Sequence, residues 1–243
     1  MKRVVSVCMV AVRQTIWKLL AIIAVMAAAE IALFCRLLPS AALTQGQWGS
    51  WFDHMLELSW FHWILAAAVA ALYVVQVAQG GDGKGKLTYT LQRLPMGERA
   101  VTTLWGVVHT ISYWILWAAQ FAVVLVCWKL YAAYYPGQAS SLELFTKFYY
   151  SDFLHALIPM QDYARVAMNA LLFPALGFGA AYACFLVRAG QKPILPISLI
   201  SVSMTATASS YRDGLGDELK LLIYVMALGY MLWRIWWGDY EET

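Results

Sequence analysis

Charged residues are scarce in this sequence: Asp, Glu, Lys and Arg make up only 13% of its 243 residues. Soluble domains carry about 25% charged and about 45–50% apolar residues. This chain is 62% hydrophobic, with a mean hydropathy of +0.61. The composition excludes a single soluble globule, and it excludes a disordered chain, because so apolar a sequence cannot stay solvated. It predicts an integral membrane protein.

Cysteine is also sparse, and the four cysteines stand singly in apolar stretches, at Cys8, Cys35, Cys127 and Cys184. The sequence contains no C-x-x-C pair and no Cys/His spacing typical of a zinc site. It contains no H-E-x-x-H spacing either. Neither a disulfide framework nor a metal centre is therefore predicted.

Catalytic motifs are lacking as well. Residues 80–86, GGDGKGK, fit part of a phosphate-binding loop, but Leu87 stands where Ser or Thr would contact magnesium. Ser151, Asp152 and His155 are close only in sequence, and a catalytic triad is recognised by its arrangement in space. We therefore expect no ATPase site in this chain and no enzymatic activity of its own.

Long apolar stretches predict an all-α, polytopic membrane protein with six transmembrane helices in a single transmembrane domain over residues 1–243. The hydrocarbon core of a bilayer is about 30 Å thick, which about 20 helical residues cross. The predicted spans are 16–38, 58–79, 101–133, 164–187, 194–210 and 218–237.

Two segments outside these spans are informative. Residues 1–15 mix basic residues with a short apolar run, which predicts an interfacial amphipathic helix. A cleaved signal peptide ending near residues 26–30 is the alternative. The connection 134–163 is aromatic and interrupted by Pro159, so we expect it to lie at the membrane interface on the outer side.

The basic residues favour one orientation. With the N-terminus inside, eleven of the 17 Lys and Arg residues are cytoplasmic. These are Lys2, Arg3, Arg13, Lys18, Lys84, Lys86, Arg93, Arg99, Arg188, Lys192 and Arg234, and the other six are Arg36, Lys129, Lys147, Arg165, Arg212 and Lys220. Because cytoplasmic loops are enriched in Lys and Arg, both termini are predicted to be cytoplasmic, in a multi-pass protein of the cell membrane.

The most informative stretch connects the second and third predicted spans: residues 87–106, LTYTLQRLPMGERAVTTLWG. Leu87, Leu91 and Leu94 recur at helical spacing and give a short helix one apolar stripe. A helix of this kind either docks into a groove on another protein or rests on the lipid headgroups.

Residues 90–99, TLQRLPMGER, resemble the corresponding loop of ATP-binding-cassette type-2 permeases. The layout is similar too: a basic start, six spans, cytoplasmic termini and a short fifth span after Pro193 and Pro196. The resemblance implies a coupling helix that docks on an ATPase subunit. By position it comprises Tyr89, Thr90, Leu91, Gln92, Arg93, Leu94, Pro95, Gly97, Glu98 and Arg99.

The resemblance also implies the function and the partners. The chain would be the permease subunit of a transporter. The transporter would be an exporter, since that family mostly exports. Its partners would be a nucleotide-binding ATPase subunit, a second permease subunit (identical or homologous) and membrane lipids, with no nucleic acid. The chain itself would bind no cofactor, because ATP and Mg belong to the partner. The connection 134–163 is larger than a minimal permease needs.

Two other classes stay open. One is a non-transporting accessory or sensor subunit that tethers an ATPase, because docking serves tethering as well as transport. The other is a polytopic membrane enzyme, for which the sequence offers only scattered polar residues.

Polar residues within the spans are candidates for function, because a charge in hydrocarbon costs at least about 2.5–3.5 kcal/mol. Glu30 could face a substrate cavity, pair with a neighbouring helix or reach water near the outer surface. His62, His109 and Gln120 suit hydrogen bonds between helices. Together with Ser201 and Thr205 of the short fifth span, Glu30 is a candidate for the translocation path. Pro174, Gly177 and Gly179 form either a hinge or a close helix contact.

The conduit hypothesis predicts that replacing Ser201 and Thr205 together by alanine reduces transport. In this hypothesis, their hydroxyl groups line a polar path beside the subunit interface. Transport into membrane vesicles measures the effect, and unchanged transport by the double variant would remove this role.

Overall fold

The computed structural model describes residues 2–41, 51–80, 97–135, 141–159, 162–194, 196–198 and 214–237. Throughout these ranges the regular secondary structure is helical, and they contain no strand. The helices are α1 (Lys2–Ala41), α2 (Trp51–Leu58), α3 (Phe61–Gly80), α5 (Glu98–Tyr134), α6 (Ser141–Tyr150), α7 (Asp152–Leu157), α8 (Tyr163–Arg188) and α10 (Gly214–Trp237). The all-α prediction is confirmed for this part of the chain.

Five of these helices are long and apolar enough to cross a membrane. Their apolar segments are Val4–Pro39, Phe61–Ala78, Glu98–Tyr134, Tyr163–Arg188 and Glu218–Trp237. The predicted span 194–210 falls mostly outside the described residues. The count of six spans and the orientation of the termini therefore stay predictions.

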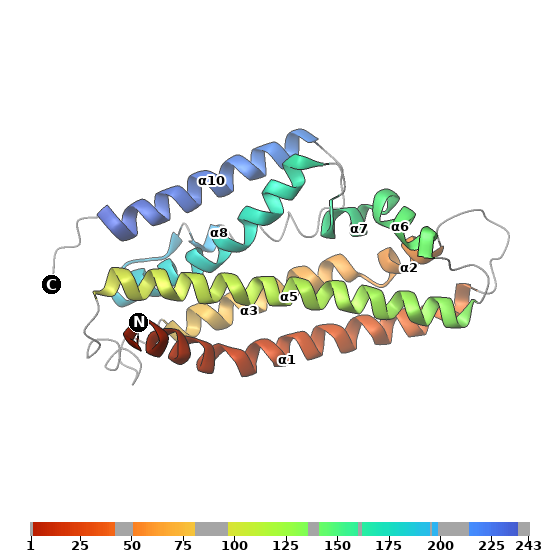
Figure 1. Cartoon of the computed structure of the whole chain (residues 1–243), viewed down its shortest axis with the longest axis horizontal. Coiled ribbons are helices and arrows are strands. Elements are labelled where there is room, and N and C mark those ends of the chain that lie inside the picture. The colour runs from red at the N-terminus through yellow and green to blue at the C-terminus, as the bar shows by residue number, and fades with distance from the viewer. Residues whose placement is uncertain are drawn as a thin grey trace.

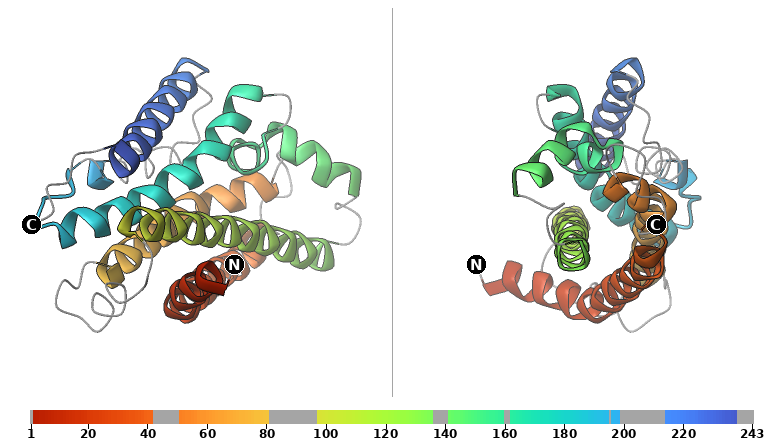
Figure 2. Two further views of the ribbon diagram at one scale, coloured as in Figure 1. Left: turned by 60° about the vertical axis from the view of Figure 1, so that its left-hand side comes forward. Right: turned by 90° about the vertical axis from the view of Figure 1, so that its right-hand side faces the viewer.

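The long helices form an elongated bundle in which α5 lies beside α1 along most of its length (Figure 1). Helix α5 packs against α1 and α8, α3 contacts α1 and α8, and α10 packs mainly on α8 (Figure 2). The N-terminus of α1 lies at the same end of the bundle as the start of α5 and the ends of α8 and α10. We call this the N-terminal end, and the opposite end holds α2, α6 and α7.

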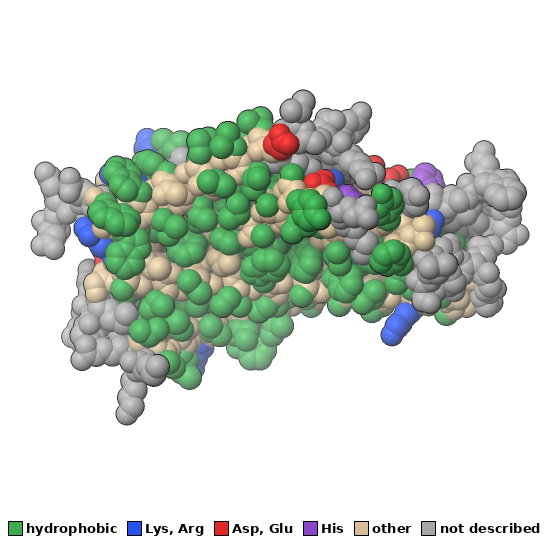
Figure 3. Space-filling view, turned by 45° about the horizontal axis from the view of Figure 1, so that its top comes forward, with side chains coloured by type: hydrophobic (Ala, Val, Ile, Leu, Met, Phe, Trp, Pro, Cys, Tyr) green, Lys and Arg blue, Asp and Glu red, His purple; other side chains and the backbone are tan. Residues whose placement is uncertain are grey.

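Large apolar side chains cover much of the bundle surface, while Lys and Arg side chains lie toward its ends (Figure 3). Trp17 is 76% exposed, Val25 71% and Val74 60%. A monomeric soluble protein rarely exposes apolar patches of this extent, whereas lipid accepts them without cost. The surface is therefore that of a membrane protein.

Helix α1 differs from the prediction of a separate interfacial helix over residues 1–15. The structure joins this segment and the first span in one helix of 40 residues. Residues 2–38 contain neither proline nor glycine, so nothing in the sequence breaks the helix. Val7 and Ala11 are buried against Val101, Trp105 and Ala181. The start of the chain thus belongs to the helix bundle.

The connection predicted over 134–163 contains the short helices α6 and α7. Ring contacts hold this end of the bundle together, with centroids 5.0 Å apart for Phe52 and Trp128 and 5.9 Å apart for Phe61 and Phe153. Lys147 of α6 forms a 3.3 Å ion pair with Asp53 of α2. The Phe61–Phe153 contact packs α7 of this connection against the start of α3, and the ion pair joins α6 to α2.

Helix α8 is continuous through Pro174, and Gly177 lets it approach α5. A Cβ atom at Gly177 would lie 2.5 Å from the backbone nitrogen of Thr110 and 2.8 Å from its Cα. These atoms are backbone and cannot rotate away. Of the two interpretations given to Pro174, Gly177 and Gly179, close packing thus has direct support at Gly177.

We expect Gly177→Ala to lower the melting temperature in detergent, because overpacking costs about 1–3 kcal/mol. The better helix propensity of alanine offsets about 0.5–1 kcal/mol of this loss. Gly229→Ala in α10 is the matched control, because a Cβ there meets no atom within 4 Å. The control should melt at or above the wild-type temperature, and equal melting of the two variants would contradict the close contact.

Candidate functional site

Glu30 of α1 is fully buried and is hydrogen-bonded to α5. The Nε2 atom of Gln120 donates to its Oε2 atom at 3.0 Å, and neither side chain is exposed. Of the three alternatives for Glu30, the structure favours the pair with a neighbouring helix. Direct access to water has no support, because the exposed fraction of Glu30 is 0%.

One oxygen atom of each side chain in the Glu30–Gln120 pair accepts no hydrogen bond from the described residues. Glu30 Oε1 and Gln120 Oε1 are buried and have no hydrogen-bond partner among the described residues. Buried polar atoms are normally paired, and each unpaired one costs about 1–3 kcal/mol. A polar group passing between α1 and α5 could donate hydrogen bonds to these two oxygens.

Helix α5 carries a row of buried polar side chains along the face that packs into the bundle. They follow helical spacing and comprise Thr102, Trp105, His109, Ser112, Tyr113 and Gln120. The Ser112 hydroxyl donates to the carbonyl oxygen of Val108 at 3.0 Å, as hydroxyls in membrane helices commonly do. His109 has 0% exposure, and its ring meets that of Trp105 edge-on at 5.7 Å. Neither ring nitrogen of His109 has a partner within the described part of the chain.

Polar groups from α3 and α8 extend this row. Tyr73 donates from its hydroxyl to the carbonyl oxygen of Pro196 at 2.9 Å. Tyr113 of α5 is fully buried, and its hydroxyl group has no hydrogen-bond partner among the described residues. Cys184 donates from its Sγ atom to the carbonyl oxygen of Gln76 at 3.5 Å, and the Gln76 side chain is fully buried. Four helices therefore contribute polar groups to the interior, which we call the polar interior.

The start of α5 is tied to the ends of two other helices. Glu98 Oε1 lies 3.3 Å from Arg188 Nε at the end of α8. Arg99 Nη1 donates to the carbonyl oxygen of Trp236 in the last turn of α10 at 2.7 Å. A cation near a helix C-terminus is favoured by the helix dipole. The N-cap residue Gly97 precedes these contacts.

Several predicted site residues lie outside the described residues. They are Tyr89, Thr90, Leu91, Gln92, Arg93, Leu94 and Pro95 of the predicted coupling helix, and Ser201 and Thr205 of the predicted path. Of the predicted coupling segment, the structure describes Gly97, the N-cap residue of α5, and Glu98 and Arg99 in its first turn.

Ser151 has a structural role. Its hydroxyl oxygen accepts from the backbone nitrogen of Leu154 at 3.4 Å and caps α7. Among the described residues, no group of three or more His, Cys, Asp and Glu residues is arranged to hold a metal ion.

Sequence reasoning missed Tyr73, Gln76 and Tyr113. Only the spacing of Tyr73 and Gln76 at i and i+3 within one apolar span signalled a shared polar face. The Tyr73 hydroxyl donates to the carbonyl oxygen of Pro196, 123 residues away in the chain, so that signal alone could not identify the contact.

A double-mutant cycle tests whether Glu30 and Gln120 act as a pair. Gln120→Leu should lower the stability in detergent, because it removes the hydrogen bond to a buried carboxyl group. Glu30→Leu combined with Gln120→Leu should lose less than the sum of the single losses, with a coupling of about 1 kcal/mol. Additive losses in the unfolding free energy would contradict the pair. Gln14, near the start of α1 and less buried, provides the control variant Gln14→Leu, which should not couple to Glu30→Leu.

No protein-family model, curated protein or solved structure matches this chain. The functional interpretation therefore depends on its own residues. Two features carry it: the polar interior between the apolar helices, and the charged N-terminal end of the bundle, where α5 begins.

Proposed function

We propose that this chain is the membrane-spanning subunit of an ATP-binding-cassette transporter, an exporter driven by separate nucleotide-binding subunits. The observation that carries the proposal is the connection of α5 to two other helices through the last two residues of the predicted coupling segment. Glu98 and Arg99, which end that segment, contact Arg188 of α8 and Trp236 of α10. A force applied to the segment thus reaches three helices.

The geometry of α5 supports transmission over a long distance. Its 37 residues rise about 1.5 Å each, which gives a rod of about 55 Å. The rod carries the buried polar row, including Gln120, the partner of Glu30. Displacing α5 from α1 would separate this pair and expose its oxygens between the helices. The polar interior then offers hydrogen bonds along a path through an otherwise apolar bundle.

In this proposal the chain hydrolyses nothing. ATP and Mg are held by the nucleotide-binding subunits, whose closure moves the coupling segment. Two membrane subunits, identical or homologous, act together in the cell membrane with their termini in the cytoplasm. The arginines Arg99, Arg188 and Arg234 at the N-terminal end of the bundle support this orientation.

Charge and polarity changes in the coupling segment test the proposal. Arg93→Glu and Leu94→Asp should each reduce the amount of nucleotide-binding subunit that co-purifies from native membranes by at least about tenfold, since docking needs an apolar stripe and a matched charge. Both variants should insert into the membrane at wild-type levels.

Lys86→Glu is the matched control, because it reverses a charge in the same connection outside the docking segment. It should retain the ATPase subunit. Wild-type recovery with Arg93→Glu and Leu94→Asp would remove the docking role of this segment. An ATPase that stays bound without any ATP-driven transport would identify a tethering subunit instead.

A further inference from the structure

Glu30 lies deep within the apolar part of α1. It follows the exposed Lys18 by 12 residues and precedes the exposed Arg36 by six. At about 1.5 Å per residue, these separations are about 18 Å and about 9 Å along the helix axis. The two cations are therefore about 27 Å apart, close to the hydrocarbon thickness of about 30 Å. The carboxyl group lies between them, nearer to the level of Arg36.

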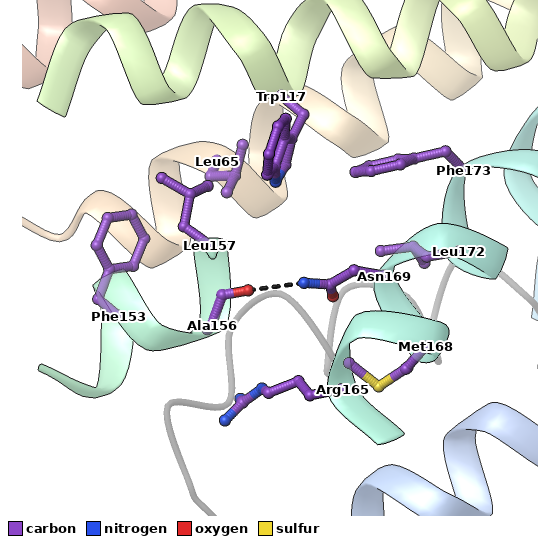
Figure 4. A pocket seen from close by; sticks show the side chains of 10 residues that line it. All are labelled: Leu65, Trp117, Phe153, Ala156, Leu157, Arg165, Met168, Asn169, Leu172 and Phe173. Carbon is purple, nitrogen blue, oxygen red and sulfur yellow. Dashed lines mark hydrogen bonds between the residues drawn. The ribbon is translucent and has the colours of Figure 1, made fainter. Parts of the chain in front are cut away.

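The turns on either side of the Glu30–Gln120 pair are apolar on both helices. The side chains one turn before and one turn after Glu30 on α1 and Gln120 on α5 are buried in the hydrophobic core. These four are Met26, Phe34, Leu116 and Val124. Trp117 of α5 lines a cavity between α3, α5, α7 and α8, but neither Glu30 nor Gln120 does (Figure 4). That cavity therefore brings no water to the carboxyl group.

No described cation compensates a negative charge on Glu30. Its hydrogen bond within the described part of the chain comes from Gln120, and it forms no ion pair there. The titratable side chains on this part of α5 and α1 are the thiols of Cys127 and Cys35, which carry no positive charge. None of the described charged or titratable side chains of α2 and α3, the other helices packed on α1, bonds to Glu30. They are Asp53, His54, Glu57, His62 and Tyr73.

We infer that Glu30 is a proton-binding site: its carboxyl group holds a proton while α1 and α5 are packed together, and releases it to water when the two helices separate. A carboxylate removed from water without a cation is strongly destabilised, and a single hydrogen bond does not offset this loss. A proton on Oε1, the oxygen without a described partner, removes the charge, while Oε2 still accepts from Gln120.

Separation of α1 from α5 lets water reach the carboxyl group. The proton then passes from the carboxylic acid to a water molecule and leaves a solvated carboxylate. The shorter route out of the bundle leads toward the level of Arg36, about 9 Å away along α1.

The inference concerns the packed contact of α1 and α5 and does not depend on the transport proposal. The packed form binds the additional proton, so low pH favours packing and high pH favours separation. The stability that the bound proton contributes is therefore present at low pH and is lost as the pH rises.

Infrared spectroscopy of the purified full chain in an uncharged detergent tests the site, because the C=O stretch of a carboxylic acid is separate from the bands of carboxylates and peptide groups. At about pH 7, exposed Asp and Glu side chains are ionised. The wild type should retain a carboxylic acid band at this pH, and Glu30→Gln should lose most of it. Glu57→Gln is the matched control and should keep the band, because Glu57 is exposed on α2.

The pH dependence of unfolding in the same detergent tests the release of the proton. The unfolded chain exposes Glu30 to water and binds about one proton fewer at this position. Between about pH 6 and about pH 7, the unfolding equilibrium constant of the wild type should therefore rise about tenfold more than that of Glu30→Gln. The neutral amide of the variant has the shape of the protonated acid, so the variant should keep the packed contact.

Three results would overturn the inference. A wild type without the carboxylic acid band at about pH 7, or a variant Glu30→Gln that keeps it in full, would show that Glu30 holds no proton. Equal pH dependence of unfolding in the wild type and Glu30→Gln would show that packing binds none. Loss of the band on adding sodium ions at constant pH would show a site for metal cations in place of a proton site.

Discussion

The hydrocarbon core of a membrane supplies no hydrogen bonds, so a polar group that enters it is stabilised by a partner within the protein. This constraint explains why the polar side chains of α5 face the bundle interior and why Glu30 lies against Gln120. Hydroxyl groups satisfy themselves locally, as Thr110 does by donating to the carbonyl oxygen of Gly106 at 2.8 Å. Lipid tails are as apolar as the helix side chains, so the hydrophobic effect does not drive helices together within a membrane. Close contacts such as that at Gly177 therefore hold α5 and α8 together.

Helix α5 connects the charged N-terminal end of the bundle with the polar interior. At its start, α5 contacts the ends of α8 and α10 through Glu98 and Arg99. In its middle it supplies Gln120 to the buried pair.

Much of the fold could be predicted from the sequence, because membrane spans are a matter of length and hydropathy. The apolar segments of α3, α5, α8 and α10 fall within a few residues of the predictions. The contacts could not be predicted in this way: Gln120 is 90 residues from Glu30, and sequence spacing carries no information across helices. The sequence places Arg165 only among the outer basic residues, and its burial could not be predicted from spacing along the chain.

The measurement that tests the central claim most directly is the mass of the assembly that contains this chain. The assembly would be extracted from native membranes in a mild detergent and weighed by native mass spectrometry. The account predicts two membrane subunits, either two copies of the 27.3 kDa chain or one copy with a homologue, together with two nucleotide-binding subunits. A chain that emerges with lipid alone, and with no nucleotide-binding subunit, would contradict it.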